Sequence, residues 1–272
     1  MTALSTAGTL ASLHRYPVKS MMGEDLNAAR ITPKGLFGDR AYALCDAETR
    51  KIVSAKNPRK WPNMFSFRAT YVVPPEPAGE LPAVRVTLPH GELAVSSSDD
   101  FDSAVSQALG RAVYLLSSAP PAAELEEYWP DMEGLAHRDH VTDEAVPAGT
   151  FFDLATLHVL TTSTLDALRS LYPAGRFEPR RFRPNLIIAT PNQTGFVENQ
   201  WIGKTISIGD EVKLKITGPC PRCVMTTLAQ GDLPKDPGVL KTAAQHNNVQ
   251  VGVYASVLQT GFVRIGDSVS VQ

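Results

Sequence analysis

The stretch KTISIGDEVKLKITGPCPRCVMTT, residues 204–227, decides how the chain is interpreted. Its first part, KTISIGDEVKLKITG, is strand-like, and we expect the same of VMTTL after Cys223. Between them, Cys220 and Cys223 form a Cys-x-x-Cys pair. Such a pair can be a redox disulfide, half of a zinc site, or one structural thiol beside a reactive one.

On both sides of the central segment, strand-like runs separated by Gly, Pro, Asn or Asp dominate the chain. This spacing predicts a mainly β (α+β) fold built from barrels or strongly twisted sheets. Three segments with capping residues or helical spacing, 96–110, 161–172 and 234–247, are predicted helices. We divide the chain into residues 1–118, a Pro- and Ala-rich connecting segment 119–149 without sustained periodicity, and residues 150–272.

Composition narrows the classes of partner. The 272 residues are 43% hydrophobic and 20% charged, with a net charge of −2. This overall composition and charge do not favour nucleic acid or an anionic membrane as a partner. No apolar run is long enough to span a bilayer, and the first residues do not resemble a secretory signal. Three cysteines do not make a disulfide framework, so we expect a reducing, cytoplasmic setting.

The residues around the cysteine pair leave its role open. A zinc site needs four ligands, but Cys45 is remote and none of the six histidines forms a spaced pair. A thioredoxin-like pair normally opens a helix, whereas VMTTL is strand-like. Two buried structural thiols remain possible. Against that, Arg222 is a permanent cation adjoining a thiol, and it favours a thiolate.

Several further segments are suited to an anion. Lys19 and Ser20 follow Pro17, where a strand should end, and Arg40 closes the nearby GDR. Before the apolar run at 186–189, we expect strand alternation to point Arg183 and Asn185 the same way. Hydroxyls and free amides occur at the start of the predicted helix, at Thr161, Thr162 and Ser163. The basic run SAKNPRK, residues 54–60, is interpreted as surface charge.

Together, these motifs resemble the MOSC superfamily with its N-terminal β-barrel region, and the amidoxime-reducing proteins within it. The resemblance runs from about Leu13 to Val269 and rests on the order YPVKS, GDR, FFDLATLHVLTTSTL, RFRPN and IGDEVKLKITGPCPRCVMTT. It implies an N-terminal MOSC β-barrel-like region over 1–118 and a C-terminal MOSC β-barrel over 150–272, with a few peripheral helices.

The resemblance also implies a molybdenum–molybdopterin cofactor, a pyranopterin dithiolene whose metal is bound by one cysteine thiolate. By its match to the family pattern, the metal ligand and catalytic residue is Cys223, whereas Cys220 is given no ligand role. A soft thiolate suits a metal already bound by sulfur. The family positions that hold the cofactor match Lys19, Ser20, Arg40, Thr161, Thr162, Arg183, Asn185, Arg222 and Tyr254.

The function that the resemblance implies is the reduction of N-hydroxylated compounds, such as amidoximes, hydroxylamines and N-hydroxylated bases. No four-cysteine set for an iron–sulfur cluster follows FVRIGDSVSVQ. We therefore expect an external electron donor, such as a flavoprotein reductase, a ferredoxin or a haem protein, and a cytoplasmic enzyme without a membrane partner. The alternatives are a sulfur carrier, a cofactor-binding or handover protein, and a β-barrel with ordinary surface charge.

Overall fold

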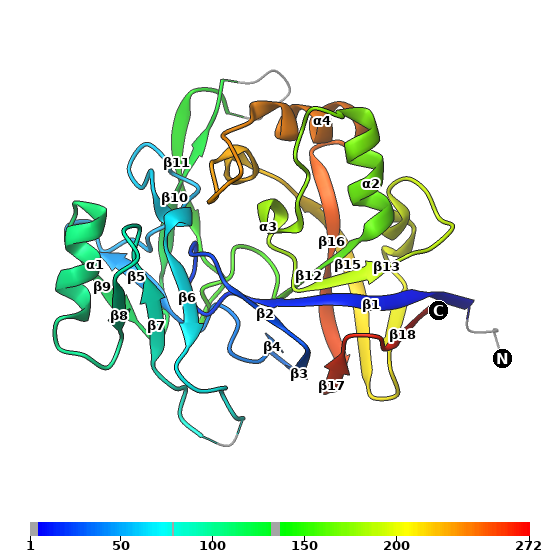
Figure 1. The fold of residues 1–272 in the computed structure, drawn as a ribbon, viewed down its shortest axis with the longest axis horizontal. Helices are drawn as coiled ribbons and strands as arrows, with labels where there is room; N and C mark the ends of the chain where they lie inside the picture. Colours follow the sequence, from blue (N-terminus) through cyan, green and yellow to red (C-terminus); the bar gives the residue numbers. More distant parts are fainter. Residues whose placement is uncertain (1–4, 78, 132–136) are drawn as a thin grey trace.

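Seven strands close into a barrel in the computed structural model, which describes residues 5–77, 79–131 and 137–272 (Figure 1). In pairing order they are β13 (Leu186–Ala189), β12 (Leu157–Thr161), β16 (Gln250–Gln259), β15 (Val212–Pro221), β14 (Thr205–Ile208), β18 (Ser268–Val271) and β1 (Ser5–Arg15). β1 closes the ring by pairing with β13, and β12 and β13 form its parallel pair. The eighth strand of this sheet, β2 (Glu24–Leu26), pairs with β1 outside the ring. The first strand of the chain therefore completes a barrel built otherwise from residues 157–271.

The stretch KTISIGDEVKLKITGPCP, residues 204–221, contains β14 and β15. Ile206, Ile208, Leu214 and Ile216 alternate with more exposed residues and are fully buried in the barrel interior. Gly209 has a φ of 56° in the turn between the strands, a conformation that glycine adopts without strain. This alternation confirms the strand prediction for residues 204–218.

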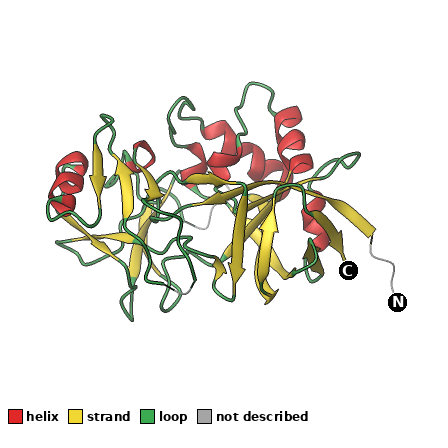
Figure 2. Cartoon of the chain, turned by 60° about the horizontal axis from the view of Figure 1, so that its bottom comes forward, coloured by secondary structure: helices red, strands yellow, loops and turns green. Residues whose placement is uncertain are grey.

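β3 (Ala28–Thr32) pairs with β4 (Gly35–Leu36) and β17 (Gly261–Arg264), and the buried residues of this sheet belong to the barrel core. The remaining small sheets form a second lobe, at the left of Figures 1 and 2, in which β5 (Ala43–Asp46) pairs with β9 (Val113–Leu116), and β6 (Arg68–Tyr71) with β7 (Val84–Thr87) and β8 (Leu93–Val95). A second hydrophobic core, which includes Trp61, Phe65 and Phe67, packs within this lobe. The mainly β fold with few helices is confirmed.

Helices cover the outside of both lobes (Figure 2). They are α1 (Phe101–Leu109), α2 (Thr162–Leu171), α3 (Pro179–Phe182) and α4 (Pro237–Asn247), with 3-10 turns η1 (Met64–Ser66), η2 (Val197–Trp201) and η3 (Val224–Thr227). The three predicted helices are α1, α2 and α4. Thr161 caps α2, Asp236 caps α4, and Gly110 ends α1 with a φ of 70°. In the part of the chain that the structure describes, no helix has the length and hydropathy of a membrane span.

Two local expectations were wrong. The connecting segment contains a hairpin, β10 (Glu124–Trp129) and β11 (His140–Ala145), and is not an irregular linker. Residues 224–227 form η3 and not a strand, with Thr226 and Thr227 donating their hydroxyls to carbonyls three residues earlier. The boundaries at 118/119 and 149/150 stay predictions, because β1 and β17 pair across them.

Candidate functional site

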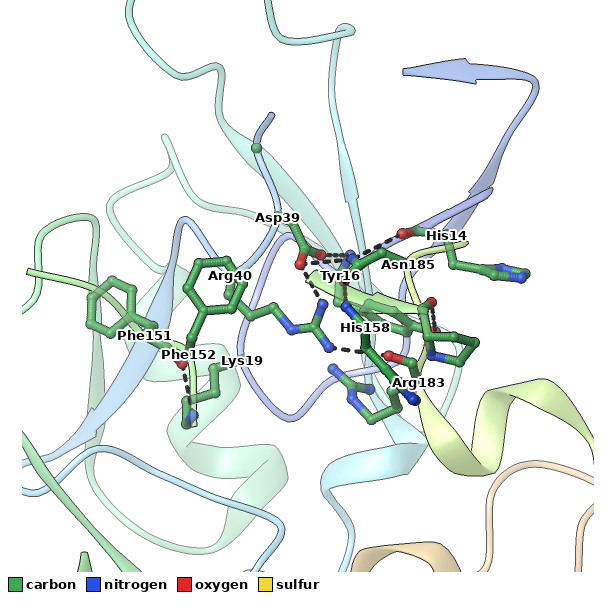
Figure 3. A network of polar contacts seen from close by, with 12 residues as sticks. His14, Tyr16, Lys19, Asp39, Arg40, Phe151, Phe152, His158, Arg183 and Asn185 are labelled. Carbon is green, nitrogen blue, oxygen red and sulfur yellow. Dashed lines mark hydrogen bonds and ion pairs between the residues drawn. The ribbon is translucent and has the colours of Figure 1, made fainter. Parts of the chain in front are cut away.

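A cavity of about 450 Å³ is lined by residues from both lobes, from the hairpin and from the end of β15. Eight of the predicted site residues line it: Lys19, Ser20, Arg40, Arg183, Asn185, Arg222, Cys223 and Tyr254. Figure 3 shows part of this network, with Arg40 and Arg183 beside Tyr16 and Lys19 directed at the carbonyl oxygen of Phe151. The residues lie up to 235 positions apart in sequence, and the fold brings them together.

Lys19 is placed at the cavity by the end of β1. Its ammonium group donates to the carbonyl oxygen of Phe151 at 2.7 Å and pairs with Asp153 at 2.6 Å. Burial lowers the pKa of Lys19, and the Asp153 carboxylate opposes that shift. Ser20 follows with a φ of 65°, and its hydroxyl accepts from the amide of Ala55 at 3.0 Å. The Lys-Ser pair is therefore fixed at the junction of the lobes rather than solvated.

Arg40 is held by a buried carboxylate and an aromatic ring. Asp39 pairs with the Arg40 guanidinium and also accepts from the amide of Tyr16 at 2.7 Å. The guanidinium carbon lies 4.5 Å from the centre of the Tyr16 ring. Burial raises the pKa of Tyr16 to about 12. Tyr16 is therefore a neutral platform at ordinary pH.

Arg183 and Asn185 reach the site differently from the expectation. Arg183 has a φ of 52° at the end of α3, and β13 begins only at residue 186, so strand alternation does not orient the pair. Arg183 stacks on the Tyr16 ring at 4.1 Å and donates to the carbonyl oxygen of Met21 at 2.5 Å. Burial, followed by the Arg40 charge, lowers the pKa of Arg183 to about 10.

The Asn185 side chain is occupied by the protein. Its amide donates to Asp39 at 2.9 Å and to the carbonyl oxygen of His14 at 3.3 Å. Its oxygen accepts from the backbone amide of His158 at 3.2 Å. Asn185 therefore orders the lining, with both ends of its amide engaged.

The two cysteines of the pair have opposite environments. Both line the cavity, but Cys220 is 1% exposed and accepts from the Arg222 guanidinium at 2.6 Å, whereas Cys223 is half-buried. Burial raises the pKa of Cys220, but Arg222 and His158 outweigh it and lower the value to about 6. Burial and the nearby Glu127 raise the pKa of Cys223 to about 11. The cation of the Cys-x-x-Cys pair thus favours the thiolate of Cys220.

Behind the cysteines, His158 and Tyr254 pack edge to face, with ring centroids 6.2 Å apart. The Nε2 of His158 lies 3.0 Å from the carbonyl oxygen of Val251. Gly252 is required there, since it has a φ of 81° and a Cβ would lie 2.2 Å from the same nitrogen. Burial raises the pKa of Tyr254, which lines the cavity as a neutral phenol.

The structure does not bring Thr161 and Thr162 to the cavity lining. Thr161 is fully buried; it caps α2 by accepting from the amide of Thr164 and donates to Glu198 at 2.6 Å. The Thr162 hydroxyl accepts from the amide of Thr190 at 3.1 Å. Both hydroxyls serve the junction of α2 with its neighbours.

Other lining residues were missed. Lys56, from the run interpreted as surface charge, lines the cavity with a side chain only 14% exposed and pairs with Glu127 at 2.9 Å. That interpretation was wrong for Lys56, because a buried carboxylate 71 positions away compensates its charge. Glu127, Trp129 and Glu144 come from the hairpin that the sequence did not predict.

The lining fits an anionic, sulfur-rich metal group. No three His, Cys, Asp or Glu side chains of the described residues gather as a metal site, so a metal at Cys223 would need further ligands from a cofactor. Arg222 keeps a buried Nε with no partner among those residues. Five cations line the same cavity: Lys19, Arg40, Lys56, Arg183 and Arg222. This donor set suits phosphate and pterin oxygens beside a thiolate-bound metal.

Comparison with known proteins gives two family-model matches. The MOSC N-terminal beta barrel domain matches residues 7–112, and the MOSC domain matches residues 148–270. Mitochondrial amidoxime reducing component 2 of Rattus norvegicus is 24% identical over 302 residues, covering 98% of this chain and 84% of that protein. Mitochondrial amidoxime-reducing component 1 of Mus musculus is 25% identical over 241 residues, covering 83% and 67%.

Among solved structures, the YUAD protein from Bacillus subtilis aligns with 100% of this chain and 98% of its own, at 11% identity and a TM-score of 0.49.

Proposed function

Because the chain belongs to the MOSC-domain superfamily, with an N-terminal MOSC β-barrel domain ahead of its MOSC domain, we propose that it is a molybdenum-cofactor-dependent reductase of N-hydroxylated compounds. Its family associates it with the molybdenum cofactor. The reduction of N-hydroxylated compounds is supported by two relatives named as amidoxime-reducing components, at 24% and 25% identity.

One observation carries the proposal: a single half-buried thiol shares one cavity with five cationic side chains. Cys223 offers a soft ligand to a metal, and bound metal would hold it as a thiolate despite its raised pKa. The cations would bind the negative charges of the pterin and its phosphate. A surface charge cluster would not be stacked on Tyr16 or buried as Arg183 is.

Each residue has a separate role in this proposal. Arg183 and Arg40, fixed against Tyr16, would hold the phosphate end. Arg222, whose Nε has no partner among the described residues, would hold the pterin near Cys223. When bound, the molybdenum centre would supply a two-electron store and an acceptor for oxygen.

The reaction balances with an external donor. An amidoxime takes up two electrons and two protons, its N–O bond breaks, and an amidine and one water molecule leave. The electrons would come from a separate protein of the flavoprotein, ferredoxin or haem class. The chain's own contribution is to orient the substrate beside Cys223 in the cavity.

The test is to purify the protein from a host that makes the cofactor, and to measure molybdenum by mass spectrometry and oxidised pterin by fluorescence. We expect near-stoichiometric amounts of both, and reduction of benzamidoxime to benzamidine with reduced methyl viologen as donor. Loaded protein without turnover would favour the handover alternative. Protein that binds neither metal nor pterin, even after reconstitution, but carries a persulfide would favour the sulfur carrier.

A further inference from the structure

The inner face of hairpin β10–β11 forms one wall of the cavity. Antiparallel pairing places Glu127 opposite Thr142 and Trp129 opposite His140, and alternation puts Glu144 on the same face. Glu127, Trp129 and Glu144 all line the cavity. Figure 1 shows the hairpin as the green ribbon above β6. The roles proposed above belong to Cys223 and to the cations of this cavity, and none belongs to a residue of the hairpin.

The hairpin is held in place by the N-terminal lobe. Ion pairs join them: Lys51 with Asp143 at 2.5 Å and with Glu126 at 3.9 Å, Lys56 with Glu127 at 2.9 Å, and Lys60 with Glu126 at 3.1 Å. Backbone bonds add to them, since the amide of Ile52 donates to Glu124 and the amide of Tyr128 donates to Lys56. The wall is therefore preorganised, and most of its carboxylates are neutralised by these contacts.

Glu144 is the exception among the hairpin residues that line the cavity. The described residues place no cation within ion-pair distance of it, whereas Glu127 is paired with Lys56. The Thr142 hydroxyl donates to Oε1 of Glu144 at 2.7 Å, and the Trp129 indole N–H donates to that hydroxyl at 2.8 Å. This relay fixes both the indole and the carboxylate, and leaves Oε2 of Glu144 without a donor in the described part of the chain.

We propose that Glu144 and Trp129 form a subsite for a planar cationic nitrogen group on the substrate, such as an N-hydroxyguanidine, and for the amidinium product; this inference rests on the proposed function. A carboxylate binds an amidinium through charge-assisted hydrogen bonds, and an indole face attracts a cation. In this proposal the arginine and lysine side chains of the cavity bind an anionic cofactor, and Glu144 and Trp129 bind a basic substrate.

Binding tests the subsite without turnover. The probes are benzamidinium and its neutral analogue benzamide, titrated by calorimetry into the purified protein with its molybdenum content measured. For Glu144→Gln, which keeps the shape and the Thr142 contact, we expect benzamidinium affinity to fall ~10-fold, as for loss of a close charge pair, and benzamide affinity to stay constant. Glu124→Gln is the matched control, because it removes the same charge from the opposite, exposed face of β10.

Equal affinity of the wild type and Glu144→Gln for benzamidinium would overturn the subsite, as would an equal loss in Glu124→Gln. Trp129→Leu should weaken the binding of both probes, because it removes the indole surface.

Turnover separates this inference from the proposed function. N-hydroxy-N′-phenylguanidine, assayed at a pH at which it is protonated, and neutral benzamidoxime differ in the charge of the reacting group at similar size. The wild type should favour the cationic one in kcat/KM, and the preference should shrink ~10-fold in Glu144→Gln. Charge-selective probe binding by loaded protein that reduces neither compound would sink the reductase proposal and leave the subsite standing. Reduction of both at equal rates by both variants, with no selective binding, would sink only the subsite.

Discussion

Arg222 donates to Cys220, and Cys223, three residues after Cys220, lines the same cavity and is the more exposed of the two. Cys220 is thus already engaged as a buried thiolate partner of the guanidinium, with a pKa lowered to about 6 by Arg222 and His158 against the effect of burial. A second metal ligand at Cys220 would have to displace that charge-assisted contact. These contacts therefore favour a single thiolate ligand, at Cys223.

Alanine variants of the three cysteines test that assignment. We expect the molybdenum content of Cys223→Ala to fall at least ~10-fold, because even the loss of a residue that contacts a metal ligand typically lowers metal affinity by that much. Cys220→Ala should keep most of its molybdenum. The measurement is molybdenum per protein after purification. Cys45→Ala is the control, because Cys45 is buried like Cys220 but lies in β5, away from the cavity lining. Comparable metal loss in the Cys220 and Cys223 variants would rule out a single ligand.

The sequence predicted the basic part of the lining well, because Lys19, Arg40 and Arg222 adjoin recognisable motifs. It missed Lys56 and Glu127, because each looks like surface charge until the other is placed beside it. Thr161 was predicted both as a helix cap and as a cofactor contact, because the two have the same sequence signal, and the structure shows it as the cap of α2.

At the scale of elements, the start of α2 encloses a carboxyl group. Glu198 of η2 is fully buried, and its Oε2 accepts from the hydroxyls of Thr161 and Thr164, both at 2.6 Å. Its Oε1 has no partner among the described residues. Burial raises the pKa of Glu198 above its usual value of 4.5, because the hydroxyls compensate only part of the desolvation.

This raised pKa predicts a pH-dependent stability. Above pH 4.5 the unfolded chain releases the Glu198 proton before the folded protein does, so the free energy of unfolding falls as pH rises, by at most ~1.4 kcal/mol per pH unit, until the folded pKa is reached. Glu198→Gln lacks this term. Its stability relative to the wild type should therefore increase from pH 4.5 to pH 7, measured by urea unfolding. A difference that is constant over this range would mean that Glu198 is ionised in the folded protein.

Elements with local signals were predicted, and elements that depend on distant partners were not. Thr161, Asp236 and Gly110 mark helix ends in the sequence and in the structure. Hairpin β10–β11 was missed because β10, ELEEYW, directs a glutamate inward at Glu127, where the alternation rule expects an apolar residue. The Lys56 partner that makes this possible is contributed by another segment.

At the scale of the whole molecule, strands are exchanged between the two halves of the chain. β1 closes the barrel between β13 and β18, and β17 of the C-terminal half pairs with β3 of the N-terminal half. The closure is tight at Gly8, where a Cβ would lie 1.8 Å from the carbonyl oxygen of Ala189. Domain boundaries drawn from the order of motifs cannot detect this exchange, because strand pairing follows contacts in space rather than position in the chain.

The exchange predicts how fragments behave. Residues 150–272 alone lack β1, so β13 and β18 would keep unpaired edges and the barrel core would open to water. Residues 5–36 attached after Gln272 by a short linker should restore the barrel, because Ser5 pairs with Val271 and the join is a hairpin connection. We expect a cooperative thermal transition by circular dichroism for the rearranged chain and none for the fragment. Gly8→Val in the rearranged chain is the matched control and should abolish the transition, since a side chain there blocks the contact with β13. A cooperative transition in residues 150–272 alone would instead make the C-terminal strands a self-sufficient unit and β1 an accessory to it.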